Sequence, residues 1–382
     1  MKKYTDTGKK DTRSGFGAGL LEAGKMDPNV VALTADLKGS LKMDAFAAEF
    51  PDRFIQCGIA EANMVGAASG LALTGKIPFI GSFAEFVTGR VYDQLRQEVS
   101  YGMTNVKIAS SHAGITLGED GATHQTMEDI ALMRALPGMV VLCPCDYNQT
   151  KNATIAAAKY NGPVYLRFGR PSVPNFTGEN EPFEIGKAYV LNAGKDVTII
   201  ATGHLVWEAL QAAEALEAEG ICAEVINVAT IKPLDTPTIV ASALKTKAVV
   251  VAEEHNLAGG LGELICGTLA VKCPTPVELV NGGDEFGQSG KPAELMAAYG
   301  LDAANQNEGL PETTKRNGIS KRMPIVKTET WSSKPERRRE RIPRIRMMPI
   351  KTTGAGVGNT LNTPPHRSPH AGVSRLHTDE WK

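Results

Sequence analysis

The sequence has 382 residues, which exceeds one typical domain, and its 41 Lys and Arg nearly balance its 42 Asp and Glu. The charge is uneven, because residues 307–382 hold 16 basic and 7 acidic side chains and leave 25 basic and 35 acidic ones before them. No stretch approaches the roughly 18 apolar residues of a membrane span, and residues 1–11 lack the apolar core of a secretory signal, so we expect a cytoplasmic protein with no membrane partner.

The first half of the chain alternates short apolar runs with stretches of helical periodicity. The alternation is typical of a parallel sheet covered by helices on both faces. We therefore expect an α/β, doubly wound domain over residues 12–175. Strands are predicted at 30–34, 54–57, 77–80, 106–110, 140–143 and 164–168, with helical stretches such as 60–73 and 87–101 between them.

A segment with Pro, Gly and acidic residues at 176–185 predicts a linker to a smaller α/β domain over 186–305. Strands are predicted in this second domain at 196–201, 222–228 and 248–252. A helix is predicted at 206–219, with Val206, Leu210, Ala213 and Leu216 along one apolar stripe. The second domain is expected to pack helices on a sheet, as the first one does.

Residues 306–382 are rich in Lys, Arg and Pro and show no apolar period. Such a segment buries too little apolar surface to offset its ordering entropy, so we expect a disordered basic tail. Arg337, Arg338 and Arg339 would attract an anion, but we do not expect a nucleic acid partner.

The six cysteines lie in apolar or strand-like runs, and none forms a CxxC pair. Only Cys143 and Cys145 are close, and neither has a matching cluster of His or Cys. Structural metal sites need about four such ligands, so we predict reduced thiols and no metal site in this chain.

The strongest signal of a site follows the strand predicted at 106–110. His112 lies eight residues before Asp120, and His124 ends the run Gly-Glu-Asp-Gly-Ala-Thr-His. The loop thus carries a carboxylate and two imidazoles beyond a strand end, where open α/β sheets bind ligands. It resembles the donor-substrate loop of transketolases, and the resemblance extends from about residue 13 to about residue 305. It covers only the second half of an ordinary transketolase.

Glu61 begins a predicted helix in Gly58-Ile59-Ala60-Glu61-Ala62-Asn63. An acidic residue in a first helical turn is most often a favourable dipole interaction. The segment is similar, however, to the thiamine diphosphate motif of transketolases, which implies that Glu61 hydrogen-bonds the aminopyrimidine of this cofactor. A carboxyl group there holds the imino tautomer, so that the exocyclic nitrogen can take the proton from thiazolium C2.

Phe83 and Phe86 are three residues apart and are predicted on one face of a helix, which by itself is typical of core packing. The resemblance implies that Phe86 stacks on the aminopyrimidine with Phe83 as its neighbour. Asp36 resembles a cofactor-proximal position at a subunit contact. Arg90 is one residue out of place for the family's Arg-x-aromatic-Asp-Gln run, so it receives no role.

Sugar phosphates need fixed cationic and hydroxyl donors. Four candidates, predicted beyond strand ends, match phosphate-binding positions of transketolases in order and spacing: Arg13, Ser40, His112 and Arg170. Arg167 is the alternative at the same strand exit as Arg170. The resemblance assigns Asp120 and His124 to sugar hydroxyls and implies that His124 also shuttles protons during carbon–carbon cleavage.

Two glycine-rich stretches receive structural roles. The glycines at 15, 17 and 19 precede the first strand instead of following it, so they do not form a dinucleotide-binding loop. The stretch 253–262 resembles a part of the family's C-terminal domain that lies outside the catalytic centre, and it is expected to be structural.

Thiamine diphosphate also needs a divalent cation, which the family binds through Gly-Asp-Gly and an Asn about 30 residues later. Gly283-Asp284-Glu285 lacks both the second Gly and the downstream Asn. Mg²⁺ needs oxygen ligands where it bridges the diphosphate. The resemblance therefore implies a split enzyme, in which a separate N-terminal transketolase subunit binds Mg²⁺ or another divalent cation and two copies of each chain form a heterotetramer.

The resulting prediction is the C-terminal subunit of a two-chain transketolase of the pentose phosphate pathway. It would transfer a two-carbon ketol unit from a ketose phosphate to an aldose phosphate. Alternatives are a subunit of deoxyxylulose-phosphate synthase, the β subunit of a 2-oxo acid dehydrogenase, and a non-catalytic regulatory partner. The phosphate set around Ser40, His112 and Arg170 favours a sugar phosphate substrate.

Overall fold

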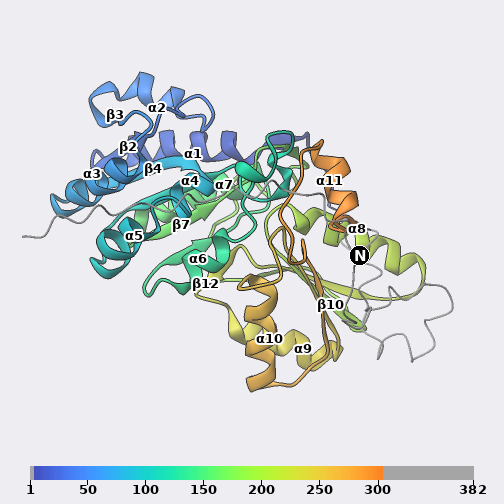
Figure 1. Cartoon of the computed structure of the whole chain (residues 1–382). Coiled ribbons are helices and arrows are strands. Elements are labelled where there is room, and N and C mark those ends of the chain that lie inside the picture. The colour runs from blue at the N-terminus through green and yellow to red at the C-terminus, as the bar shows by residue number, and fades with distance from the viewer. Residues whose placement is uncertain (1–3, 304–382) are drawn as a thin grey trace, which may run out of the picture. The chain divides into compact units, whose positions relative to one another are not determined.

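The computed structural model describes residues 4–303, which form two large β-sheets, each with helices on both faces, and one two-stranded ribbon (Figure 1). The basic tail predicted at 306–382 lies outside the described residues. Within residues 4–303, none of the helices has the length and apolar content that crossing a membrane requires.

The first sheet has seven strands in the order β12-β6-β7-β5-β4-β2-β3. Six of them come from the first predicted domain and are parallel to their neighbours. They are β2 (Val30–Thr34), β3 (Phe54–Gln56), β4 (Ile77–Phe83), β5 (Lys107–Ser111), β6 (Val140–Leu142) and β7 (Val164–Arg167). The predicted parallel sheet is confirmed, with strand ends within three residues of those expected.

The seventh strand, β12 (Thr230–Lys232), comes from the second predicted domain and pairs antiparallel with β6. The apolar periodicity did not predict it, because its three residues are too few to show one. A short antiparallel ribbon, β1 (Lys10–Asp11) with β8 (Ser172–Val173), joins the two ends of the first domain.

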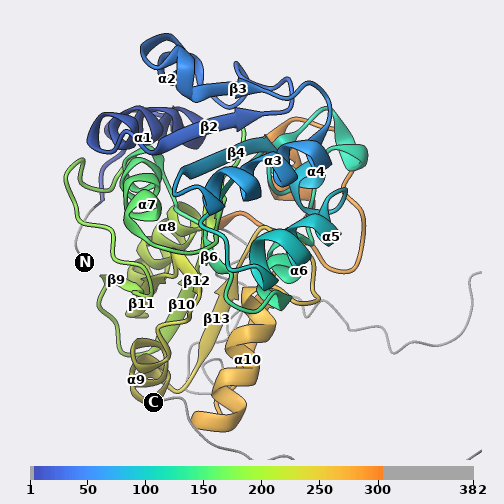
Figure 2. The ribbon, with the colours of Figure 1, turned by 90° about the vertical axis from the view of Figure 1, so that its left-hand side faces the viewer.

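Helices cover the first sheet on both faces (Figure 2). One face carries α1 (Thr12–Met26), α2 (Asp44–Glu49) and α7 (Tyr147–Lys159). The other carries α3 (Glu61–Leu73), α4 (Ala84–Thr88), α5 (Tyr92–Gln94) and α6 (Asp129–Ala135). Alternation along β2 explains the two layers, because Val30 and Ala32 pack toward α1 while Val31 and Leu33 pack on the opposite face.

The glycines at 15, 17 and 19 lie inside α1. A Cβ atom on Gly15 would lie 2.4 Å from the carbonyl oxygen of Tyr147, and one on Gly19 would lie 2.6 Å from that of Lys151. Gly15 and Gly19 therefore allow α1 and α7 to pack backbone against backbone.

Two predictions in the 77–101 region are wrong. Strand β4 continues to Phe83, which pairs with Ser111 of β5, so Phe83 ends a strand and only Phe86 lies in a helix. The helix predicted at 87–101 is interrupted after α4 at Gly89 and resumes as α5 and the π-helical turn Leu95–Tyr101. Gly89 weakens the helix at this point, which apolar spacing alone does not register.

The second sheet has the order β14-β13-β10-β11-β9. Its parallel strands are β10 (Val197–Ala201), β11 (Ala223–Asn227), β13 (Val249–Ala252) and β14 (Val277–Val280), and β9 (Tyr189–Asn192) is antiparallel at the edge. Helix α8 (Leu205–Ala218) buries its predicted stripe on one face, and α9 (Thr236–Thr246) and α10 (Leu261–Lys272) cover the other. A last helix, α11 (Pro292–Ala298), packs near α8.

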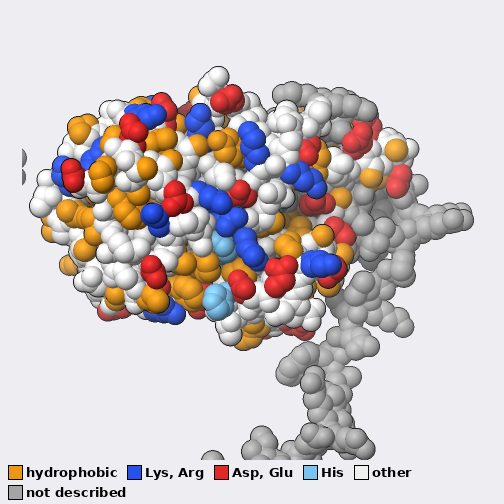
Figure 3. Space-filling model, turned by 90° about the horizontal axis from the view of Figure 1, so that it is seen from above, with side chains coloured by type: hydrophobic (Ala, Val, Ile, Leu, Met, Phe, Trp, Pro, Cys, Tyr) orange, Lys and Arg blue, Asp and Glu red, His pale blue; other side chains and the backbone are white. Residues whose placement is uncertain are grey.

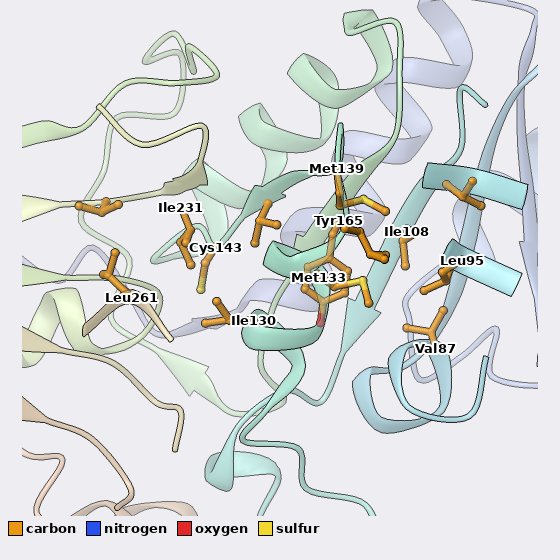
Figure 4. Close-up of a cluster of buried hydrophobic side chains, with 14 of the residues drawn as sticks. Val87, Leu95, Ile108, Ile130, Met133, Met139, Cys143, Tyr165, Ile231 and Leu261 are labelled. Carbon is orange, nitrogen blue, oxygen red and sulfur yellow. The ribbon is translucent and has the colours of Figure 1, made fainter. Parts of the chain in front are cut away.

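One apolar core continues from the first domain into the second. Figure 4 shows Ile130 and Cys143 of the first domain beside Ile231 and Leu261 of the second. All four side chains are at most 1% exposed. The second domain therefore packs against helix α6, which follows the loop that carries His112 and His124.

Candidate functional site

The carboxylate of Glu61 lies at the N-terminal end of α3, directly after the loop that follows β3. Glu61 is only 3% exposed, yet no side chain caps this helix start. Nη1 of Arg90 donates to both carboxylate oxygens, at 3.1 and 3.0 Å, from a side chain that is 51% exposed. A buried carboxylate is thus held by a cation that reaches it from the surface.

The rings of Phe83 and Phe86 lie 5.8 Å apart and nearly parallel, at 16°. The guanidinium carbon of Arg90 lies 4.4 Å from the centroid of the Phe86 ring. A planar, donor-rich group therefore contacts both the Glu61 carboxylate and the face of Phe86. Arg90 follows Phe86 by four residues, and this spacing was the one sequence signal for the contact.

His112 follows β5 directly and stacks on Phe83, with ring centroids 3.8 Å apart. Its φ of 60° lies in the left-handed region, and the imidazole Nδ1 lies 2.7 Å from the Ser111 hydroxyl. Burial lowers the pKa of His112 to about 3, and nearby Arg13, Arg170 and His124 add to this effect. His112 is therefore a neutral hydrogen-bonding group near pH 7.

His124 follows the short 3₁₀ turn Gly121–Thr123, and its Nδ1 lies 2.9 Å from the Thr123 hydroxyl. Its ring meets Phe86 edge-on at 5.4 Å and Phe83 at 6.4 Å. The structure thus brings His112 and His124 to the same aromatic pair. Asp120 lies at the start of the same turn and is exposed.

Arg13 lies in the first turn of α1, two residues beyond the end of the short strand β1. The helix begins at Thr12, immediately after the two-residue strand β1, which was too short to be recognised. Nη1 of Arg13 donates to the backbone carbonyl of Ser40 at 3.3 Å, and its Nε lies 3.2 Å from Asp11. Burial lowers the pKa of Arg13, and the charge of Arg170 also lowers it.

Arg170 is the exposed cation beyond β7. Its Nη1 donates to the carbonyl of Leu117 at 2.8 Å and to the Glu119 carboxylate at 3.0 Å. Backbone hydrogen bonding and the contact with Arg170 lower the pKa of Glu119. Glu119 therefore presents an anion to Arg170.

Arg167, the sequence alternative to Arg170, is 4% exposed. Its Nε and Nη2 donate to the two oxygens of Asp129 at 2.8 and 3.2 Å. Tyr165 donates to the same carboxylate at 2.6 Å. Burial alone would raise the pKa of Asp129, but Arg167 outweighs it and the pKa is lowered. Arg167 is engaged in the core, whereas the side chain of Arg170 is 39% exposed.

Asp36 is exposed after β2, with a left-handed φ of 60°. Its backbone N–H donates to the side chain of Gln56 at 2.8 Å. Within residues 4–303, no group of three or more His, Cys, Asp or Glu side chains is placed to hold a metal ion.

A pocket of about 260 Å³ lies beside the loop that carries His124. Its lining includes Gln125, Asn256 and Phe286 and none of the predicted site residues. The face shown in Figure 3 carries Lys and Arg side chains gathered near exposed histidines. The predicted site residues therefore lie outside this pocket, with Glu61 and His112 buried.

Two family models match the chain. The model described as transketolase, pyrimidine binding domain, matches residues 8–175, and the one described as transketolase, C-terminal domain, matches residues 186–305. Together they cover the part of the chain that contains both sheets.

Individual proteins give the same result. The chain is 48% identical over 311 residues to a Methanocaldococcus jannaschii protein named "Putative transketolase C-terminal section", covering 80% of this chain and 97% of that protein. It is 44% identical over 300 residues to "6-deoxy-6-sulfo-D-fructose transketolase subunit SqwH" of Clostridium sp. (strain MSTE9), covering 78% and 93%. A solved structure described as "Split gene transketolase, inactive beta4 tetramer" matches with a TM-score of 0.75 and 45% identity, covering 80% and 97%. The chain therefore belongs to the transketolase family, as a split subunit that carries the pyrimidine-binding and C-terminal domains.

Proposed function

We propose that this chain is the C-terminal subunit of a cytoplasmic two-chain transketolase. It transfers a two-carbon ketol unit from a ketose phosphate to an aldose phosphate with thiamine diphosphate, in the pentose phosphate pathway. The observation that carries this proposal is the buried Glu61 carboxylate facing a planar cation that rests on Phe86.

The residues around Glu61 fit the aminopyrimidine of the cofactor. A guanidinium is planar and presents N–H donors, and here it contacts a buried carboxylate and an aromatic face at once. An aminopyrimidine needs the same two partners, a carboxyl group at a ring nitrogen and a flat apolar neighbour. Glu61 would hold the ring through its nitrogen, Phe86 would stack on it, and Phe83 would support Phe86.

When bound, thiamine diphosphate supplies the carbon nucleophile and the electron sink of the reaction. Glu61 would hydrogen-bond the ring nitrogen of the bound cofactor and so favour its imino tautomer. Asp36 would lie near the cofactor at a contact with another subunit. The chain contributes orientation and proton handling.

An N-terminal transketolase subunit is the proposed source of the divalent cation and of the diphosphate contacts. In support, a similar split-gene transketolase assembled as a β4 tetramer is described as inactive. We propose a heterotetramer of two chains of each kind.

Arg13, Ser40, His112 and Arg170 are proposed to bind the phosphate of the sugar. Their support is electrostatic, because burial and the charge of Arg170 lower the pKa of Arg13, and burial and both arginines lower the pKa of His112. Neutral His112 would donate one N–H, while the arginines supply charge-assisted hydrogen bonds. Asp120 and His124 would bind sugar hydroxyls, and His124 would move a proton during carbon–carbon cleavage.

A second candidate is the same reaction on a sugar with a different anionic group. The relative from Clostridium is named for 6-deoxy-6-sulfo-D-fructose, and a sulfonate would also suit the paired arginines.

We also propose that the two domains span residues 12–175 and 186–305 and that residues 176–185 link them.

The decisive experiment mixes the purified chain with its N-terminal partner, thiamine diphosphate and Mg²⁺. Ketol transfer from xylulose 5-phosphate to ribose 5-phosphate is expected when both chains are present. Each chain alone is expected to be inactive. Parallel assays with 6-deoxy-6-sulfo-D-fructose as donor and with pyruvate as a decarboxylated donor separate the alternatives. Turnover by this chain alone would refute the split enzyme, and no turnover in any mixture would favour a non-catalytic partner.

A further inference from the structure

The loop between β5 and α6, residues 112–128, carries His112, Asp120 and His124, and we call it the substrate loop. Its first residues are tied to the first domain, since the N–H of Ala113 donates to the carbonyl of Phe168 at 3.3 Å. The N–H of Gly114 then donates to the carbonyl of Thr126 at 2.9 Å and closes the loop on itself. Arg170 of the first domain also donates to the carbonyl of Leu117, and further anchors come from the second domain.

Glu254 is the central anchor. It lies two residues beyond β13, is 3% exposed, and accepts the backbone N–H of Thr116 on its Oε1 at 2.6 Å. Thr116 lies in the middle of the 3₁₀ turn Ile115–Leu117 of the substrate loop. A charged acceptor of this kind makes one of the stronger hydrogen bonds in a protein.

Gly114 shows how close this approach is. A Cβ atom at Gly114 would lie 2.3 Å from the carboxyl carbon of Glu254, and the residue has a φ of 83°. Only glycine meets both requirements, which are space for the carboxylate and a left-handed backbone. The loop sequence is therefore fitted to a carboxylate from the other domain.

Further contacts hold the far end of the substrate loop. The N–H of Asn256 donates to the carbonyl of Met127 at 2.7 Å. The amide nitrogen of Gln125 donates to the carbonyl of Gln288 at 3.1 Å and to that of Ile115 at 3.0 Å. Ile115 also joins the apolar core that contains Leu295 of α11.

Glu254 is itself held in place. Nη2 of Arg167 donates to its backbone carbonyl at 2.8 Å, and Arg167 is fixed by Asp129. Nδ1 of the buried His204 lies 3.9 Å from the other carboxylate oxygen of Glu254. The anchor thus connects the substrate loop to the rigid joint between the two sheets.

We infer that Glu254 is a positioning residue, through which the second domain holds the substrate loop so that His112 and His124 flank Phe83. The inference rests on the proposed function for its meaning in catalysis, but the anchoring itself is a property of this chain. Without the carboxylate, the Thr116 N–H loses its acceptor in a buried place and the loop gains freedom.

The first measurement uses the isolated full chain and needs no cofactor. Hydrogen exchange of residues 113–127 is expected to speed up about tenfold in Glu254→Leu and to stay near the parent rate in Glu254→Gln, whose amide oxygen still accepts. Glu253→Leu is the matched control. Glu253 is the sequence neighbour, and it accepts the N–H groups of Leu261 and Gly262 at the start of α10 instead of a loop amide.

The second measurement uses the reconstituted two-chain enzyme. KM for the donor is expected to rise about tenfold in Glu254→Leu, a loss equal to about 1.4 kcal/mol of binding. The half-saturating concentration of thiamine diphosphate should change less than the donor KM, because the loop contacts the proposed cofactor site through Phe83 and Phe86 and not through the Glu61–Arg90 pair. Glu253→Leu is expected to lower the melting temperature without moving the donor KM. If Glu254→Leu does not fold, Glu254→Asp, which is one methylene too short, is measured in its place.

The outcomes separate the inference from the function. Unchanged loop exchange and unchanged donor KM in Glu254→Leu or Glu254→Asp would overturn the inference. Equal effects in the Glu253 and Glu254 variants would also overturn it, because they would mean general destabilisation. Faster loop exchange in a chain that shows no ketol transfer with any partner would leave the anchoring intact and refute the proposed function.

Discussion

Arg90 and Glu61 form an ion pair in which one side chain is half exposed and the other is buried. One nitrogen of Arg90 contacts both oxygens of Glu61, and the same guanidinium lies over Phe86. Arg90 therefore takes the two contacts that we propose for the aminopyrimidine. On this proposal, a bound cofactor displaces Arg90, whose half-exposed side chain is the group that can leave.

Replacing Glu61 by Ala is expected to abolish ketol transfer, because the carboxyl group at the pyrimidine nitrogen is lost. A loss of at least about a thousandfold in kcat is expected for a group of this type. Assembly with the partner, measured by size-exclusion chromatography, should be intact. The same substitution at the exposed Glu49 of α2 is the control. A fully active Glu61→Ala enzyme would refute the proposed role.

Replacing Arg90 by Ala is expected to lower the half-saturating concentration of thiamine diphosphate, because the cofactor no longer competes with a bound cation. The gain should be roughly threefold to tenfold, since the ion pair is charge-assisted but half exposed. Titration of the reconstituted enzyme, followed by near-ultraviolet circular dichroism, measures it. Arg96→Ala, at an exposed site in the π-helical turn, is the control. A weaker affinity in Arg90→Ala would mean that the arginine helps to bind the cofactor.

The sequence predicted the sheet well where apolar runs are long enough to show a period. The buried runs of β2 and β10 were found because each has five residues of which four are apolar. The short strands β1 and β12 were missed, since two or three residues show no period. Fold prediction therefore failed mainly where pairing with a distant strand, and not local sequence, makes the strand.

The site was predicted as a set of residues but not as a set of contacts. Family resemblance identified Glu61 and His112, but it could not show that Arg90 pairs with Glu61 or that Glu119 pairs with Arg170. Arg167 and Arg170 are three residues apart and look alike in the sequence. They differ in burial, because Arg167 is held in the core by Asp129. Asp129 is 38 residues away along the chain, so the local sequence does not show this contact.

Arg170→Gln is expected to raise the KM for a phosphorylated donor by about tenfold or more, because a charge-assisted contact with the anion is lost. The KM for hydroxypyruvate, a donor without a phosphate, should change less than twofold. An equal loss with both donors would show that Arg170 acts on the loop, through Leu117, and not on the phosphate. Glu119→Gln should move the KM for the phosphorylated donor in the opposite direction, because it removes the anion that already contacts Arg170.

Acid is expected to destabilise the chain through His112. Its folded pKa of about 3 lies below the usual 6.5, so the unfolded chain binds the proton more tightly. The stability that this group contributes is fully present above pH 6.5 and is lost as the pH falls toward 3. The loss between pH 6.5 and 5 is about 2 kcal/mol. Asparagine tolerates the left-handed backbone, so His112→Asn is a suitable variant. Over this pH interval its free energy of unfolding, measured in urea, should fall by about 2 kcal/mol less than that of the parent. Equal losses in both proteins would contradict the buried, neutral imidazole.

Asp129→Asn tests whether the core ion pair, and not a ligand, determines the position of Arg167. The substitution keeps the shape of the side chain but leaves the Arg167 charge buried and unpaired, which should cost about 3–5 kcal/mol of unfolding free energy. Lys38→Ala removes the exposed pair with Asp44 and should cost less than about 1 kcal/mol. Urea unfolding at pH 7 measures both. If Asp129→Asn costs no more than Lys38→Ala, the guanidinium is free to turn toward solvent. Arg167 would then compete with Arg170 for the phosphate, and the assignment of the anion site to Arg170 would fail.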